Sequence, residues 1–195
     1  MEKDHALDSD EFAASFGFEC VGRTDAGNLK PIPEVRDMCA ADLCRSFGKN
    51  WMCPPANGDI DFFAAQMAQK DSVVIVQSVA ELEDDFDFET IMETAQTHDK
   101  RFVEYAQAIK EASRAEGGGS EDGTLQRMAD ALFFGAGACI ICPECTCPDD
   151  PCRFPDKAYT SMEAAGLLVS AVCDIAGIPY NHGKGTISFT SCVVY

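Results

Sequence analysis

The chain has 195 residues, enough for one domain with its own hydrophobic core, and we predict a single domain over residues 1–195. It carries 33 acidic against 15 basic residues, a formal charge of -18, so its surface repels nucleic-acid phosphates and anionic lipids. The charged first ten residues lack the apolar segment of a secretion signal, and no later apolar run approaches the length of a membrane span. We therefore expect a cytoplasmic protein that binds neither nucleic acid nor membranes.

The first part of the chain predicts short elements. A helix is expected over 8–16, a strand from Phe18 to Arg23, and a second helix over 32–38 that begins near Pro33. The strand contains Cys20, which stands apart from the other cysteines. We expect it to be a packing residue rather than a ligand.

A first group of cysteines follows in the loop 39–55. Its members are Cys39, Cys44 and Cys53. Three thiolates are one short of the four that hold a cubane iron–sulfur cluster, so the fourth ligand is Cys152, Cys147 or a non-cysteine group, or the iron stays open to a substrate. Trp51, the only tryptophan, is expected to anchor this loop and to shield the metal from water.

The middle of the chain predicts the main helices and the clearest strand. Residues 72–79 are β-branched and continuous enough for a strand that is buried on both faces. A long helix over 86–115 has an apolar stripe, and His98 on that stripe is expected to be a hydrogen-bonded core residue rather than a metal ligand. Further helices are expected over 59–69 and 124–131, with a flexible acidic loop over 116–123.

A second group of cysteines, in the loop 139–155, is the densest in the chain. Five of the eleven cysteines fall within fourteen residues: Cys139, Cys142, Cys145, Cys147 and Cys152. The first three have the C-x2-C-x2-C spacing with which one short loop presents three thiolates to a [4Fe–4S] cluster. Zinc is the alternative, because structural zinc sites also use C-x2-C pairs, although usually two separated ones.

The fourth ligand of this second site is expected to be Cys152. Cys147 is the alternative, but it lies only two residues from Cys145 and leaves little chain to reach another corner of the cluster. Arg153 and a helix starting soon after it would add positive potential beside the cluster. The capping-box sequence from Thr160 to Glu163 predicts that helix over 160–176, with Cys173 packed inside.

A turn over 181–185 and a closing strand from Thr186 complete the chain. Together these elements predict an α/β fold with about four strands, at Phe18, Ser72, Leu132 and Thr186, in a mixed and partly parallel sheet. Because both cysteine loops leave segments close to strands, we expect them side by side at one end of the sheet.

Two sequence signatures resemble a known family. The segments M-C-A-A-D-L-C-R-S-F-G-K-N-W-M-C-P-P and C-I-I-C-P-E-C, followed by D-P-C-R-F-P and S-M-E-A-A-G-L-L-V, are similar to an uncharacterised family of predicted metal-binding proteins, domain of unknown function 2284. The resemblance covers nearly the whole chain, and the family is found mostly in anaerobic bacteria and archaea. It implies metal binding by Cys39, Cys44, Cys53, Cys139, Cys142, Cys145 and Cys152, while Cys147 falls outside the family pattern.

These observations predict a protein with one or two [4Fe–4S] clusters that exchanges electrons in anaerobic metabolism. Its acidic surface is expected to dock on the basic surface of a protein redox partner. Two alternatives stay open at this point. One is a zinc-stabilised interaction module, and the other is an enzyme whose substrate binds an open iron of the cluster.

Overall fold

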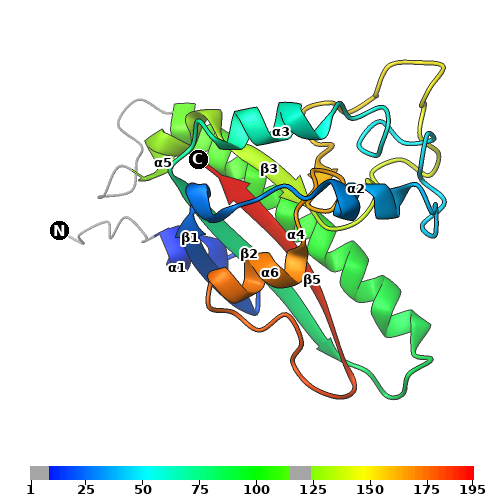
Figure 1. The fold of residues 1–195 in the computed structure, drawn as a ribbon. Coiled ribbons are helices and arrows are strands. Elements are labelled where there is room, and N and C mark those ends of the chain that lie inside the picture. Colours follow the sequence, from blue (N-terminus) through cyan, green and yellow to red (C-terminus); the bar gives the residue numbers. More distant parts are fainter. Residues whose placement is uncertain (1–8, 115–123) are drawn as a thin grey trace.

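The computed structural model describes residues 9–114 and 124–195 (Figure 1). Its centre is a five-stranded sheet in the order β1-β2-β5-β3-β4. Three neighbouring pairs are antiparallel, and only β3 and β4 are parallel, so the predicted mixed α/β fold is confirmed. The strands are β1 (Cys20–Asp25), β2 (Ser72–Glu81), β3 (Leu132–Gly135), β4 (Thr160–Ser161) and β5 (Thr186–Val194).

Helices cover both faces of this sheet (Figure 1). Their residues contribute to two separate hydrophobic clusters, one on each face. In the described part of the chain, no helix combines the length and the apolar character needed to cross a membrane. The helices are α1 (Ser9–Ala14), α2 (Pro33–Cys39), α3 (Ile60–Met67), α4 (Phe88–Arg114), α5 (Thr124–Arg127) and α6 (Val169–Ile175), with 3-10 turns at Ala26–Asn28 and Met128–Asp130.

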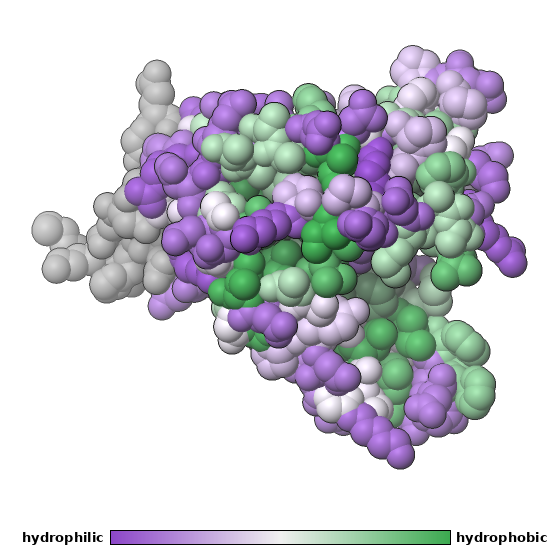
Figure 2. All heavy atoms as spheres, in the orientation of Figure 1, coloured by the Kyte–Doolittle hydropathy of each residue, from purple (hydrophilic) through white to green (hydrophobic). Residues whose placement is uncertain are grey.

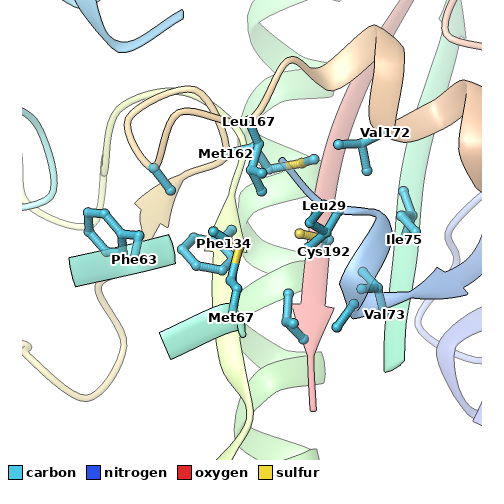
Figure 3. Packing of buried hydrophobic residues seen from close by; sticks show 13 residues of the cluster. Leu29, Phe63, Met67, Val73, Ile75, Phe134, Met162, Leu167, Val172 and Cys192 are labelled. Carbon is cyan, nitrogen blue, oxygen red and sulfur yellow. The ribbon is translucent and has the colours of Figure 1, made fainter. Parts of the chain in front are cut away.

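Strand β2 shows how the sheet is buried on both sides. Val73 and Ile75 point into the cluster that α3 and α6 cover, which Figure 3 shows, whereas Val74 and Val76 point into the cluster under α4. All four side chains are at most 1% exposed. Alternate residues of a strand face opposite sides of a sheet, so a continuous β-branched run fits a central strand. The prediction for 72–79 is confirmed.

The other predicted elements agree with the structure in most places. The four expected strands and the helices near 32–38, 59–69 and 124–131 are present. Helix α4 buries Phe102, Tyr105 and Ile109, but the prediction of a buried stripe is wrong for Phe88 in its first turn, which is 67% exposed. The expected loop over 116–123 and the first residue of the helix over 8–16 lie outside the described residues.

The predicted helix over 160–176 is wrong in its first half. Thr160 and Ser161 form strand β4, which pairs in parallel with the end of β3. The Ser161 hydroxyl then accepts a hydrogen bond from the Ala164 amide at 3.1 Å, so the sequence that signals a capping box closes a local turn instead. The helix itself, α6, begins only at Val169.

Gly166 explains why the chain cannot continue as a helix from residue 160. Its φ angle is +86°, in the left-handed region. A Cβ atom at this position would lie 2.6 Å from Cδ1 of Ile60. The Gly166 carbonyl also accepts a hydrogen bond from the Ile32 amide at 2.7 Å, which ties the segment before α2 to this turn.

His98 lies in the core between α4 and the sheet, as predicted. Its Nδ1 is 3.0 Å from the Ser78 hydroxyl, and its Nε2 is 2.8 Å from the Ser191 hydroxyl. Burial, helped by the nearby Arg101 cation, lowers the pKa of the imidazole to about 3. The ring is therefore a neutral, fully hydrogen-bonded bridge between the helix and strands β2 and β5.

Replacing this histidine tests the resulting pH dependence. In the unfolded chain His98 binds a proton below a pKa near 6.5, whereas in the folded chain it does so only near 3. The free energy of unfolding therefore has its full value above about pH 6.5 and falls as the pH drops from 6.5 towards 3. Between pH 7 and 4 the wild type should lose on the order of a few kcal/mol of unfolding free energy through His98. In urea unfolding, His98→Gln should not show this loss. Parallel curves for His98→Gln and the wild type would contradict the assignment.

Candidate metal centre

The two cysteine loops lie side by side at one end of the molecule, at the right of the view in Figure 1. Hydrogen bonds join them. The Asn50 side-chain amide donates to the Cys139 carbonyl at 2.9 Å, and the Trp51 indole donates to the Asp150 carbonyl at 3.0 Å. The expected proximity of the loops and the anchoring role of Trp51 are confirmed.

The first loop, 39–55, is fixed by α2 and by its own turns. Arg36 of α2 donates to the Ala164 carbonyl at 2.6 Å and also to Asn57 and Gly58, so it holds the far end of the loop. Within the loop, the Gly48 amide donates to the Pro54 carbonyl at 2.8 Å. These contacts fix the path of a segment that has no regular secondary structure.

The second loop, 139–155, leaves strand β3 and is anchored on α4 at its other end. Lys110 of α4 donates to the Asp156 carbonyl at 2.8 Å and to the Tyr159 hydroxyl at 3.1 Å, and its amino group lies 4.9 Å from the Tyr159 ring centroid. Gln107, one turn earlier, donates to the same two groups. Inside the loop, Arg153 donates to the Glu144 carbonyl at 2.9 Å.

Cys53 lies where the two groups of cysteines meet. Its side chain is buried, with the residue only 7% exposed. Burial raises the pKa of its thiol to about 12, and the neighbouring thiolates of both loops add to that shift. These neighbours are Cys44 and Cys39 from its own loop and Cys139 and Cys145 from the other.

Cys139 has a similar environment. Burial raises the pKa of its thiol, the Ile141 amide opposes this, and the thiolates of Cys152, Cys142 and Cys145 raise it further. Cys152 is therefore an electrostatic neighbour of the triplet that it is predicted to complete. Several neighbouring thiolates repel one another, so these thiols ionise together only when a cation compensates their charge. A bound metal ion supplies that charge.

A hollow of about 410 Å³ separates the two loops. Four cysteines line it, Cys139, Cys142, Cys145 and Cys152, together with the cations Arg45, Lys49 and Arg153. Among the described residues, no three His, Cys, Asp or Glu side chains converge closely enough to hold a metal ion as they stand. The donor set nevertheless fits a thiolate-bound metal group, because sulfur is concentrated here and cations border it.

The structure gathers every predicted ligand in these two loops. Cys147 is also present, with its thiol 3.9 Å from the Gly48 carbonyl of the other loop. Outside the loops, Cys173 and Cys192 are fully buried, so the packing role predicted for Cys173 is confirmed. Cys20, at the start of β1, is only half-buried.

The expected source of positive potential beside the second loop needs correction. No helix starts soon after Pro155, because the chain forms β4 and a turn before α6 begins at Val169. The favourable potential therefore comes from side chains. Arg45, Lys49 and Arg153 are the cations that line the hollow.

Asn50 is the residue of this site that sequence reasoning missed. It is only 6% exposed, and besides its bond to Cys139 its Oδ1 accepts from the Met52 amide at 3.0 Å. The type of residue gives no signal, because asparagine is common in exposed loops.

Removing the Asn50 side chain should loosen the contact between the loops. We expect Asn50→Ala to lower the free energy of unfolding by about 1–3 kcal/mol, because two partly buried backbone groups, the Cys139 carbonyl and the Met52 amide, lose their hydrogen-bond partner. Bound metal should also be lost faster to a chelator, as measured by atomic absorption. Asn28→Ala, which removes an exposed bond to Thr24, is the matched control. Equal behaviour of the two variants would show that Asn50 does not hold the loops together.

Comparisons with known proteins place this chain. A family model described as predicted metal-binding protein (DUF2284) matches residues 24–195. No curated protein and no solved structure matches the chain significantly. The matched range includes both cysteine loops and all strands after the first few residues of β1. The chain belongs to the DUF2284 family of predicted metal-binding proteins.

Proposed function

We propose that this protein binds iron–sulfur clusters through its two cysteine loops and exchanges electrons with a protein partner. The observation that carries this proposal is that the buried Cys53 lies close enough to cysteines of both loops for their thiolates to raise its pKa. Eight cysteines in two adjacent loops are too many for one zinc ion, which takes four ligands. Two [4Fe–4S] clusters would use seven or all eight of them, depending on whether the first site takes a ligand that is not cysteine.

The second loop supports one complete ligand set. Cys139, Cys142 and Cys145 have the spacing of a ferredoxin-type loop, and Cys152 lines the same hollow and is an electrostatic neighbour of Cys139. The first loop supplies Cys39, Cys44 and Cys53. Its fourth ligand under this proposal is Cys147, whose thiol already faces Gly48 of the first loop, or a group that is not cysteine.

The surroundings suit a redox centre near the surface. When bound, a [4Fe–4S] cluster accepts and returns one electron at a time. The burial of Cys53 limits the access of water to its sulfur, whereas Cys44 is exposed. Figure 2 shows hydrophobic residues among hydrophilic ones where the loops project. Leu43 of the first loop is 91% exposed, and Met38, near the end of α2, is 70% exposed. With the charge of -18, such a surface suits a partner with a basic docking face.

Metal analysis after anaerobic purification tests the class of cofactor. We expect brown protein with about four iron and four acid-labile sulfide ions per cluster, for one or two clusters. Replacing both Cys142 and Cys53 by serine should abolish the iron, whereas Cys20→Ser, outside both loops, should leave it unchanged. Colourless protein that contains zinc and no sulfide would instead support the zinc-stabilised interaction module.

Cys152→Ser tests which cluster this residue holds. We expect it to remove the same cluster as Cys142→Ser, because Cys152 borders the hollow with Cys142. Iron and sulfide content, together with electron paramagnetic resonance of the reduced protein, would identify the lost signal. Loss of the cluster that depends on Cys53 would show that Cys152 crosses over to the first loop. Cys147→Ser, examined in the same way, tests the fourth ligand of the first site.

A further inference from the structure

A second hollow lies on the other side of the segment that begins the second cysteine loop. Its volume is about 610 Å³, within the range of small-molecule sites of roughly 300–1,000 Å³. It lies between α4 and the segment 135–141, and Cys139, Ile140 and Ile141 line both this pocket and the hollow between the loops. A single stretch of backbone therefore separates the pocket from the candidate metal centre.

The walls of this pocket are mainly apolar. Helix α4 contributes Met92, Phe102 and Val103, and the opposite wall contributes Ile140 and Ile141. The segment G-A-G-A before Cys139, which is not a dinucleotide-binding motif, forms part of the lining. Its small side chains leave the space open, and a Cβ atom built at Gly137 would meet no atom within 4 Å.

One carboxylate lies inside this apolar lining. Asp99 of α4 is half-buried and makes no hydrogen bond or ion pair with any residue that the structure describes. Burial raises the pKa of its carboxyl group to about 7, which reflects the missing partner. The other charged groups of the lining, Lys100, Glu104 and Lys157, are exposed at the surface.

We propose that this pocket binds a small organic amine, with the apolar body of the ligand between α4 and the segment 135–141 and its ammonium group paired with Asp99. Asp99 is the half-buried charged group of the lining that has no partner among the described residues. An ammonium group would form a charge-assisted hydrogen bond with its carboxylate. Lys100 and Lys157 are exposed and stay hydrated, so they contribute less to ligand binding. The bound amine lies against the backbone that carries Cys139, whichever metal the cysteines hold.

Three probes with the same aromatic body test the assignment. 2-Phenylethylamine is the cation, 2-phenylethanol the neutral analogue and phenylacetate the anion, titrated into the full-length, metal-loaded protein by ligand-observed NMR. We expect the amine to bind about tenfold more tightly than the other two, since only it makes a charge-assisted hydrogen bond. Equal affinities, no binding by the amine, or tightest binding of phenylacetate through the surface lysines would overturn the proposal.

Two variants locate the binding. Asp99→Asn keeps the shape of the side chain and should reduce the affinity for the amine to that of the alcohol, while Lys157→Gln should not lower it. Ala136→Leu places a larger side chain in the lining and should weaken the binding of all three probes. If the amine binds Asp99→Asn and wild type equally well, Asp99 is not its partner. Circular dichroism of each variant checks that its fold is kept.

Discussion

The repulsion among clustered thiolates is the constraint on which this end of the molecule depends. Cys53 is buried between thiols of both loops, and its pKa is raised to about 12 by burial and by those neighbours. Without a nearby cation the Cys53 thiol stays protonated, and a protonated thiol is a poor metal ligand. The loops have few regular hydrogen bonds of their own, so a bound metal would contribute to their stability as well as to function. This links the folding of the two loops to their proposed chemistry.

The sheet provides the rigid part of that arrangement. Strands β2 and β5 are buried on both faces, and His98 joins them to α4 through two serine hydroxyls. Strand β3 lies beside β5, and its end delivers the chain directly into the second loop. Lys110 and Gln107 of α4 then hold the segment that follows this loop. One end of the loop is thus attached to the sheet and the other to α4. The residues between these ends need not form regular secondary structure and can present the cysteines.

Sequence patterns could predict the elements whose signals are local. The β-branched run 72–79 and most of the apolar stripe of α4 led to correct expectations of structure. The position of the cysteine loops next to strands led to the correct expectation that the loops lie side by side. The prediction of a helix over 160–168 failed because Thr160, in the capping-box sequence, pairs with β3 instead. Further along, Gly166 adopts a left-handed backbone conformation beside Ile60. A strand of two residues has no periodicity to detect. Asn50 and Asp99 were likewise invisible, since their roles arise from burial by segments distant in sequence.

The segment 139–141 connects the two halves of the functional interpretation. Its residues line the hollow between the cysteine loops on one side and the apolar pocket on the other. A ligand that packs against Ile140 and Ile141 therefore presses on the same backbone that positions the Cys139 sulfur, and the Asn50 amide holds that backbone from the metal side through the Cys139 carbonyl. Because the pocket and the metal site share this stretch of backbone, a ligand that fills the pocket would be expected to affect the geometry of the metal site.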